Sequence, residues 1–393
     1  MPTVEIREQQ ATQLGFPLTA ADLQTFEDPL LRKYFTPRLT SKGTELKVTK
    51  VIGLLRLANA DLVITPKVPV SGSMLLHWLH YAVNGDHPIL PRSRHWDSAG
   101  DYFPDMVVQA LLEECRKLLR DQLHKDYQRR EVIEPTVRGR LDVTRQVTHR
   151  YGMLDRLHVH TFDRTSEIWE NEVCGAALRH AAKTANDPKL RQQARQLAAK
   201  FPSCSSERAR SALARARHHL LNLRYRAAHT WAEVVLRAGG VSDLFLPREL
   251  VGDSHLLVIE QLWQRVVHRM AGSLPKIDGV KIHRNRGRQV ANFSPDALVA
   301  TSTGHVAADA KWKNYDDAMV SRDDIHQLLT YANAYQPSDP RAVIVYPSAL
   351  PTAWHTIDVK HLGSRIASID VVGVDVTVRP EVSATILRER FHS

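Results

Sequence analysis

The chain has 393 residues, of which 43% are hydrophobic and 24% are charged. This composition excludes a fibre or a disordered chain, and the length is enough for two or three domains. No stretch approaches the roughly 18 uninterrupted apolar residues of a membrane span, and residues 1–13 lack the apolar core of a signal peptide. Three scattered cysteines without a CxxC pair argue against disulfides or a cysteine zinc site, so we expect a cytoplasmic protein.

Positive charge is concentrated in one segment of the chain. The formal net charge is +10, and residues 179–237 carry 13 Lys and Arg residues against three acidic ones, which equals the whole excess. Such clustering is typical of a protein that binds a polyanion such as nucleic acid. A solvated helical face rich in arginine would show the same pattern.

Residues 1–104 are predicted to form a β-rich module. Short β-compatible runs cover Leu46–Leu57 and Asp61–Val68. Prolines then break the pattern, and a serine-capped apolar run predicts a helix over Ser71–Val83. Pro, Ser, Gly and Asp are frequent in His87–Pro104, which indicates a connector.

Residues 105–249 are predicted to be mainly helical and basic. An apolar stripe predicts a helix over Asp105–Tyr127, and Val132–Gln146 is a β-like interruption. Helix is expected again between residues 165 and 237, and Pro and Gly indicate breaks at 186–188, 201–203 and 239–240.

Residues 250–393 alternate strands and helices, which predicts an α/β domain with a mixed sheet flanked by helices. Helices are expected over Leu256–Ala271 and Arg322–Ala334. The whole chain is therefore predicted to be a multidomain α+β protein. The strands expected in the last domain are 280–283, 297–301, 305–310, 342–346, 354–359 and 371–378.

Two carboxylates and an ammonium are predicted to meet in this last domain. A Pro-Asp pair opens one strand at Asp296, and Asp-Ala-Lys closes the next strand at residues 309–311, after a turn near Gly304. Asp309 and Lys311 are two residues apart and therefore share a face of their strand. The antiparallel turn is expected to bring Asp296 back beside Asp309.

This arrangement suits a metal-dependent phosphodiester hydrolase. Paired carboxylates bind Mg²⁺, which activates a water for in-line attack, and Lys311 can orient that water or stabilise charge in the transition state. Glu260, on the preceding helix, could accept from the water, and Gln327, on the following helix, could contact a phosphate or Lys311. An isolated Asp-x-Lys is more often a surface ion pair, but its combination with these flanking helices favours a nuclease.

A resemblance to a known family rests on the block PDALVA…GHVAADAKWKNY…DDIHQLLTYANAY. This block resembles the core of PD-(D/E)xK nucleases and, more narrowly, the McrC family, the nuclease subunit of McrBC-type modification-dependent restriction systems. The superfamily's usual Glu is Asp309 here, as in that family. The likeness extends over about residues 45–350 and includes ANADLVITPKVPV, VRGRLDV, TFDRTSEIWENEV and LRYRAAHTWAEVVL.

The resemblance implies a DNA endonuclease that works with a motor protein. McrC-like proteins bind a ring of a partner AAA+ GTPase, stimulate its hydrolysis and cut DNA when translocation is blocked. The N-terminal module is expected to bind that partner. The implied catalytic residues are Asp296, Asp309, Lys311, Glu260 and Gln327, and the implied metal ligands are Asp296, Asp309, Glu260 and Ala310.

The resemblance also implies the cofactor and the partners. Mg²⁺, or Mn²⁺ in its place, is the expected cofactor, and double-stranded DNA the expected substrate, with pairing of complexes for double-strand cleavage. No G-x-x-x-x-G-K-[ST] motif occurs, so this chain is not expected to bind a nucleotide itself. No membrane partner is expected.

The basic middle region offers a second contact with DNA. Its arginines suit phosphate binding, although docking onto an acidic partner surface is equally allowed. Two rival functions remain open, namely a mainly non-catalytic activator of the GTPase ring and a stand-alone DNA repair nuclease. Two histidines of the same basic region, His218 and His219, are expected on a solvated helix face. The candidate DNA-binding residues are Arg208, Arg215, Arg217, Arg224 and Arg226.

Overall fold

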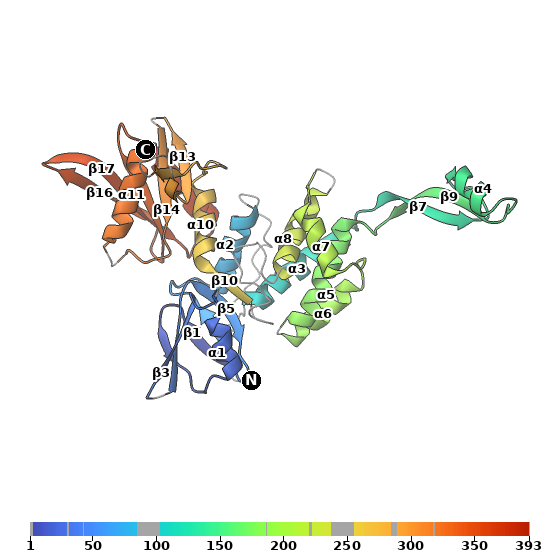
Figure 1. Cartoon of the computed structure of the whole chain (residues 1–393), viewed down its shortest axis with the longest axis horizontal. Coiled ribbons are helices and arrows are strands. Elements are labelled where there is room, and N and C mark those ends of the chain that lie inside the picture. Colours follow the sequence, from blue (N-terminus) through green and yellow to red (C-terminus); the bar gives the residue numbers. More distant parts are fainter. Residues whose placement is uncertain are drawn as a thin grey trace. The chain divides into compact units, whose positions relative to one another are not determined.

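The chain forms two compact units. The first combines residues Met1–Met106 with Ala238–Ser393, and the second contains Val107–Arg237. The second unit falls within the predicted helical middle region, and both ends of the chain belong to the first; the division at residues 104 and 249 stays a prediction. The computed structural model (Figure 1) describes residues 3–29, 31–41, 43–84, 103–185, 187–219, 222–236, 255–283, 289–302, 304–316 and 319–392.

The N-terminal part of the first unit is built on a four-stranded sheet in the order β1-β6-β5-β10. β1 runs parallel to β6, and β5 lies antiparallel between β6 and β10. A second sheet, in the order β2-β4-β3, completes this part, and Leu46, Leu55 and Leu256 share one buried core. The elements are β1 (Thr3–Arg7), β2 (Ala11–Gln13), α1 (Ala20–Glu27), β3 (Phe35–Thr40), β4 (Gly43–Val48), β5 (Val51–Arg56), β6 (Asp61–Thr65) and β10 (His255–Val258).

Strand β10 corrects one sequence prediction. A helix was predicted to begin at Leu256. Instead, His255–Val258 pairs antiparallel with Val51–Leu54 of β5. Helix α10 (Ile259–Met270) starts only afterwards. A short apolar run suits a strand or a helix equally, and here the free edge of β5 decides between them.

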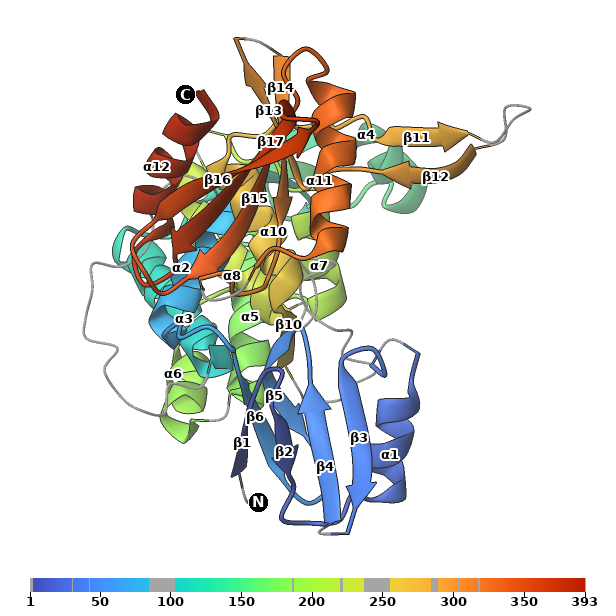
Figure 2. The ribbon, with the colours of Figure 1, turned by 90° about the vertical axis from the view of Figure 1, so that its left-hand side faces the viewer.

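The C-terminal part of the first unit is a five-stranded mixed sheet in the order β13-β14-β15-β17-β16. β14, β15 and β17 are parallel neighbours, and β13 and β16 pair antiparallel at the two edges. Figure 2 shows α11 lying along this sheet, where Leu328 packs against Ile344 and Tyr346 of β15. Helices α10 and α12 also contact the sheet. The elements are α2 (Gly72–Asn84), β11 (Val280–His283), β12 (Gln289–Phe293), β13 (Ala297–Thr301), β14 (Gly304–Ala310), α11 (Arg322–Tyr335), β15 (Arg341–Ser348), β16 (Ala353–His361), β17 (Ser364–Asp375) and α12 (Pro380–His392).

The mixed α+β class expected from the sequence is confirmed. Every strand predicted after residue 279 is present, and the helix predicted over Arg322–Ala334 extends to Tyr335. The sequence did not predict β12 or α12, and it started the strand β17 at residue 371 rather than at Ser364. Among the described residues, no helix combines the length and the apolar character that crossing a membrane requires.

The second unit contains helices and a long hairpin. Helix α5 packs against α6, α7 and α8, and β9 pairs antiparallel with β7 and with the short β8. The elements are α3 (Phe103–Arg120, which begins in the first unit), β7 (Asp126–Glu134), β8 (Arg140–Leu141), α4 (Val143–His149), β9 (Leu157–Thr165), α5 (Trp169–Thr184), α6 (Pro188–Ala198), α7 (Ser206–Ala214), the 3₁₀ turn η1 (Leu223–Tyr225) and α8 (Arg226–Leu236).

Several helix boundaries in this unit differ from those predicted. The helix predicted to reach Tyr127 ends at Arg120, and Tyr127 lies in β7. The breaks near Pro188 and Pro202 are confirmed, since Pro188 opens α6 and α7 starts at Ser206. Of the predicted connector, residues 87–102 lie outside the described residues, as does the break at 239–240.

Candidate active site

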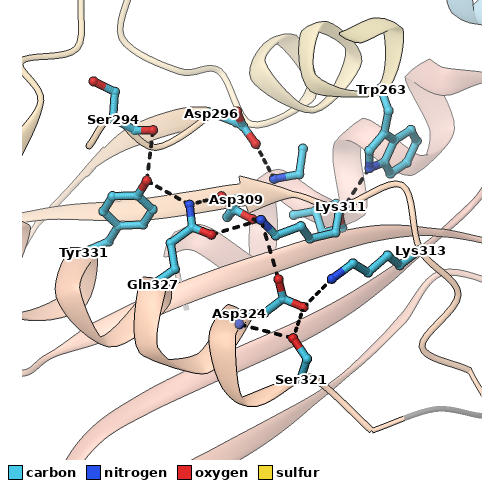
Figure 3. Close-up of polar contacts among 12 residues, drawn as sticks. Trp263, Ser294, Asp296, Asp309, Lys311, Lys313, Ser321, Asp324, Gln327 and Tyr331 are labelled. Atoms are coloured by element: carbon cyan, nitrogen blue, oxygen red, sulfur yellow. Dashed lines mark hydrogen bonds and ion pairs between the residues drawn. The ribbon is translucent and has the colours of Figure 1, made fainter. Parts of the chain in front are cut away.

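The hairpin predicted around Asp296 and Asp309 is confirmed. β13 and β14 pair with Ala297 opposite Ala308, so Asp296 lies beside the end of β14. The main-chain N–H of Ala310 donates to Asp296 Oδ2 at 2.8 Å, which fixes that carboxyl against the neighbouring strand. Figure 3 shows both aspartates converging at this end of the hairpin.

Lys311 and Gln327 complete a connected polar group. Lys311 Nζ lies 2.8 Å from Asp309 Oδ2 and donates to Gln327 Oε1 at 3.0 Å. Gln327 Nε2 in turn donates to Asp309 Oδ1 at 3.2 Å and to the Tyr331 hydroxyl at 3.1 Å (Figure 3). Tyr331 donates to the carbonyl of Ser294, just before the first aspartate. The helix α11 is thereby tied to β14 and to the segment that precedes β13.

Asp324 is a part of this site that the sequence analysis missed. Its Oδ1 lies 3.6 Å from Lys311 Nζ, and its Oδ2 accepts from Lys313, Tyr315 and Ser321 at 2.6–2.7 Å. Ser321 caps α11 by accepting from the Asp324 N–H. The Ser-x-x-Asp spacing of residues 321–324 is a helix-capping pattern, and this local signal could have identified Asp324 from the sequence.

The carboxyl groups of the site have unequal affinities for protons. Burial, and then the charge of Asp309, raise the pKa of Asp296 to about 7. Burial also raises the pKa of Asp309, although Lys311 acts in the opposite direction. Burial acts to raise the pKa of Asp324 as well, but its hydrogen bonds from Lys313, Ser321 and Tyr315 hold it at about 2.

Lys311 stays charged in this setting. Burial would lower the pKa of its ammonium, but the carboxylates of Asp309, Asp324 and Asp296 outweigh burial and raise it. Its side chain is 21% exposed, so a ligand can still reach it. A fixed, charged and accessible ammonium can stabilise negative charge on a phosphate.

The two aspartates fit a hard divalent cation. Both are largely withdrawn from water, and their mutual repulsion would be relieved by a cation between them. Among the described residues, no three His, Cys, Asp or Glu side chains are grouped to hold a metal. Mg²⁺ keeps several waters and needs only one or two carboxylates, so the pair suits it. Ala310 could add only its main-chain carbonyl.

Glu260 does not join the two aspartates in a tight cluster. It lies at the start of α10, where its Oε2 is 2.8 Å from Lys50 Nζ. Its charge still contributes to raising the pKa of Asp296, so the two groups are within electrostatic range.

Two of the candidate DNA-binding arginines contact residues of other elements in the second unit. Arg208 lies 3.1 Å from Glu172. Arg224 donates to the carbonyls of Asp121 and Gln122, at 3.0 and 2.8 Å, beyond the end of α3. These contacts hold the fold together, whatever else the two side chains bind.

The remaining arginines lie on different elements, because α7 ends at Ala214 and α8 begins at Arg226. Arg215 donates to the carbonyl of Ser211, Arg217 is exposed, and Arg226 opens α8. The helix expected after residue 203 is therefore broken between Ala214 and Arg226, which the sequence analysis did not predict, and the DNA contact of these residues stays a prediction.

The expectation of a solvated His218 was also wrong. His218 Nε2 lies 3.1 Å from His229 Nδ1, and Trp169 flanks both rings. Burial, and then the His229 and Arg226 charges, lower the pKa of His218 to about 4. His219, by contrast, is exposed.

The family of the chain follows from a comparison with family models. Residues 46–347 match the model for the McrBC 5-methylcytosine restriction system component. This chain belongs to the McrBC family. The match covers β5, β6 and the candidate site, so the McrBC assignment confirms the resemblance inferred from the motifs.

A solved structure of the McrBC system shares the fold of this chain. A chain of a Thermococcus gammatolerans assembly, described as McrB AAA+ hexamers with bound McrC, aligns over 99% of this chain and 100% of its own, with a TM-score of 0.63 and 15% identity. A second chain, from the T. gammatolerans McrBC complex, aligns over 68% of this chain and 86% of its own, at 16% identity and a TM-score of 0.47. No curated protein matches in sequence.

Proposed function

We propose that this McrBC-family chain is a Mg²⁺-dependent DNA endonuclease subunit of a restriction complex, and that it both responds to and stimulates an AAA+ GTPase partner. The observation that carries the proposal is the convergence of Asp296, Asp309 and Lys311, with Lys311 Nζ 2.8 Å from Asp309. Two carboxylates can hold a metal ion, and a fixed ammonium can stabilise the charge that develops in phosphodiester hydrolysis.

Asp296 and Asp309 would hold the metal, which when bound supplies Lewis-acid stabilisation of the charge that develops on the scissile phosphate. Lys311 keeps its proton because three carboxylates surround it, and it would donate to an oxygen of the reacting phosphate. Gln327 bridges Lys311 and Asp309 and so fixes the distance between ammonium and carboxylate. Asp324 holds the ammonium from its other side.

The partner proposal has its own support. The related T. gammatolerans structure is described as McrB AAA+ hexamers with bound McrC. In this chain, large apolar side chains are exposed along the hairpin of the second unit, including Tyr151 at 85% and Leu154 at 83%. Exposed apolar surface of this kind marks a protein interaction site. We place the contact with the GTPase there, in place of the N-terminal module expected from the sequence.

Plasmid cleavage with Mg²⁺ tests the catalytic role. Wild type, Asp309→Asn and a control, Asp358→Asn on the exposed strand β16, are each assayed with and without the AAA+ partner and GTP. We expect the wild type and the control to cleave only with partner and GTP, and Asp309→Asn to cleave at least about a hundredfold more slowly. All three should stimulate GTP hydrolysis equally.

Other outcomes would select the rival functions. Cleavage by the wild type without a partner would indicate a stand-alone repair nuclease. Absence of cleavage in every condition, with GTP hydrolysis still stimulated, would make the chain a non-catalytic activator.

A further inference from the structure

Glu8 is a buried carboxylate whose hydrogen-bond donors come from the N-terminal part of the first unit and from the segment after β14. It follows β1, is 1% exposed, and accepts from the main-chain N–H of Lys50 at 3.0 Å and of Lys67 at 3.4 Å. Its Oε2 also accepts from Trp312 Nε1 at 2.9 Å, across 304 residues of sequence. A carboxylate withdrawn from water needs such donors to be tolerated, and here one donor is the side chain next to Lys311.

Trp312 is held at more than one point. Glu8 takes its indole N–H, and Lys67 Nζ donates to its main-chain carbonyl at 2.5 Å. The ring is 7% exposed and lies 6.0 Å from the Trp263 ring. On the preceding residue, the Lys311 N–H donates to the carbonyl of Val345 at 2.9 Å. The main chain is thus hydrogen-bonded on each side of the peptide that joins Lys311 and Trp312.

Lys50, whose main-chain N–H donates to Glu8, also contacts the helix that carries Glu260. The N–H of Ile259, the first residue of α10, donates to the carbonyl of Lys50 at 3.0 Å. Lys50 Nζ pairs with Glu260 at 2.8 Å. Because Glu8 accepts from the Lys50 N–H, one carboxylate connects the start of α10 with the segment that follows β14.

We propose that Glu8 is a positioning residue of the nuclease site, which acts through Trp312 to hold the Lys311 ammonium in place against Asp309. The inference rests on the proposed nuclease function. Adjacent residues of an extended chain point to opposite faces, so a displaced Trp312 shifts the main chain that carries Lys311. A misplacement of about 1 Å can lower a reaction rate about a hundredfold.

Single-turnover DNA cleavage by the full complex, with AAA+ partner, GTP and Mg²⁺, tests the proposal. Glu8→Gln removes the charge, and Trp312→Phe removes only the indole N–H and keeps an aromatic ring. We expect each variant to cleave about tenfold more slowly while still stimulating GTP hydrolysis. If Glu8 acts through Trp312, the double variant is no slower than the slower single variant, because both changes weaken the same hydrogen bond.

Asp22→Asn is the matched control. Asp22 is also a buried carboxylate of the N-terminal part, 5% exposed, and it accepts from the N–H of Ala58 at 3.1 Å. Its hydrogen bonds do not involve Lys311 or Trp312. We expect the control to lower the melting temperature but to leave the cleavage rate of the folded protein unchanged. Equal rate losses in Glu8→Gln and Asp22→Asn would mean a general structural role and would overturn the proposal.

Amide hydrogen exchange gives a readout without metal, DNA or partner. Peptides covering residues 311–314 should exchange faster in Glu8→Gln and Trp312→Phe than in wild type or Asp22→Asn. Unchanged exchange would refute the role of Glu8. Cleavage at the wild-type rate by both variants, when Asp309→Asn is inactive, would also refute that role and would leave the proposed function unaffected. A wild type that never cleaves would instead refute the proposed function, and exchange would still decide whether Glu8 fixes this segment.

Discussion

Asp296 shows how a single residue of the site depends on its surroundings. Its carboxyl accepts from the Ala310 N–H, which by itself would favour the charged form, yet burial and the Asp309 charge raise its pKa to about 7. The folded, metal-free protein therefore binds a proton at Asp296 more tightly than the unfolded chain does. Its contribution to stability declines as the pH rises from about 4 towards 7.

Mg²⁺ binding should consequently depend on pH. Below the pKa of about 7, the cation must displace the Asp296 proton, so we expect the apparent affinity to fall about tenfold for each pH unit below 7 and to level off above it. Titration calorimetry at about pH 6 and about pH 8, in two buffers that differ in ionisation enthalpy, measures the protons released. Asp296→Asn should abolish both the release and the pH dependence. Binding at pH 6 without proton release would contradict the assignment.

Strand β17 depends on an ionic contact that holds α12 to the central sheet. Asp370 is 1% exposed and lies 2.9 Å from Arg341 of β15 and 2.7 Å from Arg390 of α12. Burial acts to raise its pKa, but the hydrogen bonds from Thr356 and Arg390, with the Arg341 charge, lower it overall. A carboxylate with a lowered pKa stabilises the fold at neutral pH and loses that effect as the pH falls through its folded pKa.

Asp370→Asn should therefore destabilise the protein in a pH-dependent way. Two guanidinium groups would lose their buried counter-charge, and we expect the free energy of unfolding to fall by about 3–5 kcal/mol near neutral pH. Below the ordinary aspartate pKa of 3.8, the wild type progressively loses the same contribution, so the difference should shrink. Urea denaturation at neutral and acidic pH measures it. Asp358→Asn, at an exposed ion pair on β16, should change stability by no more than about 0.5 kcal/mol. A difference independent of pH would exclude the charge as its cause.

At the scale of the whole molecule, the two units carry different surfaces. The first buries its polar network around the candidate site, and the second presents apolar side chains along β7, β9 and α4. Such residues lower solubility unless a partner covers them. This division agrees with a nuclease unit and a separate surface for the GTPase.

Substitutions on the hairpin should uncouple the chain from its partner. We expect Tyr151→Asp with Leu154→Asp to reduce stimulation of GTP hydrolysis at least about tenfold, because a charge is expensive to bury in an apolar interface. Stability should not change, since both side chains are more than 80% exposed. Leu362→Asp, at a 92% exposed position in the first unit, is the control and should stimulate like the wild type. Undiminished stimulation by the hairpin variant would place the contact elsewhere.

The local parts of the candidate site could be read from the sequence. The hairpin of β13 and β14 joins neighbouring segments, and strand alternation by itself puts Asp309 and Lys311 on one face. Gln327 and Tyr331 are four residues apart, a spacing that by itself places both on one face of a helix, and a hydrogen bond of 3.1 Å joins them in α11. Such features depend on periodicity and turn chemistry, which a short stretch of chain contains in full.

The contacts between distant segments were decided by tertiary packing. His255–Val258 became a strand because β5 offers an edge, and the salt bridges of Asp370 join β15, β17 and α12. Glu8 meets Trp312 only because the first turn of the chain packs beside the end of β14. The sequence of a short segment does not specify which distant residue will pack against it. The sequence thus determined the family and which short segments carry the candidate site residues, and the packed fold determined which distant groups hold those residues in place.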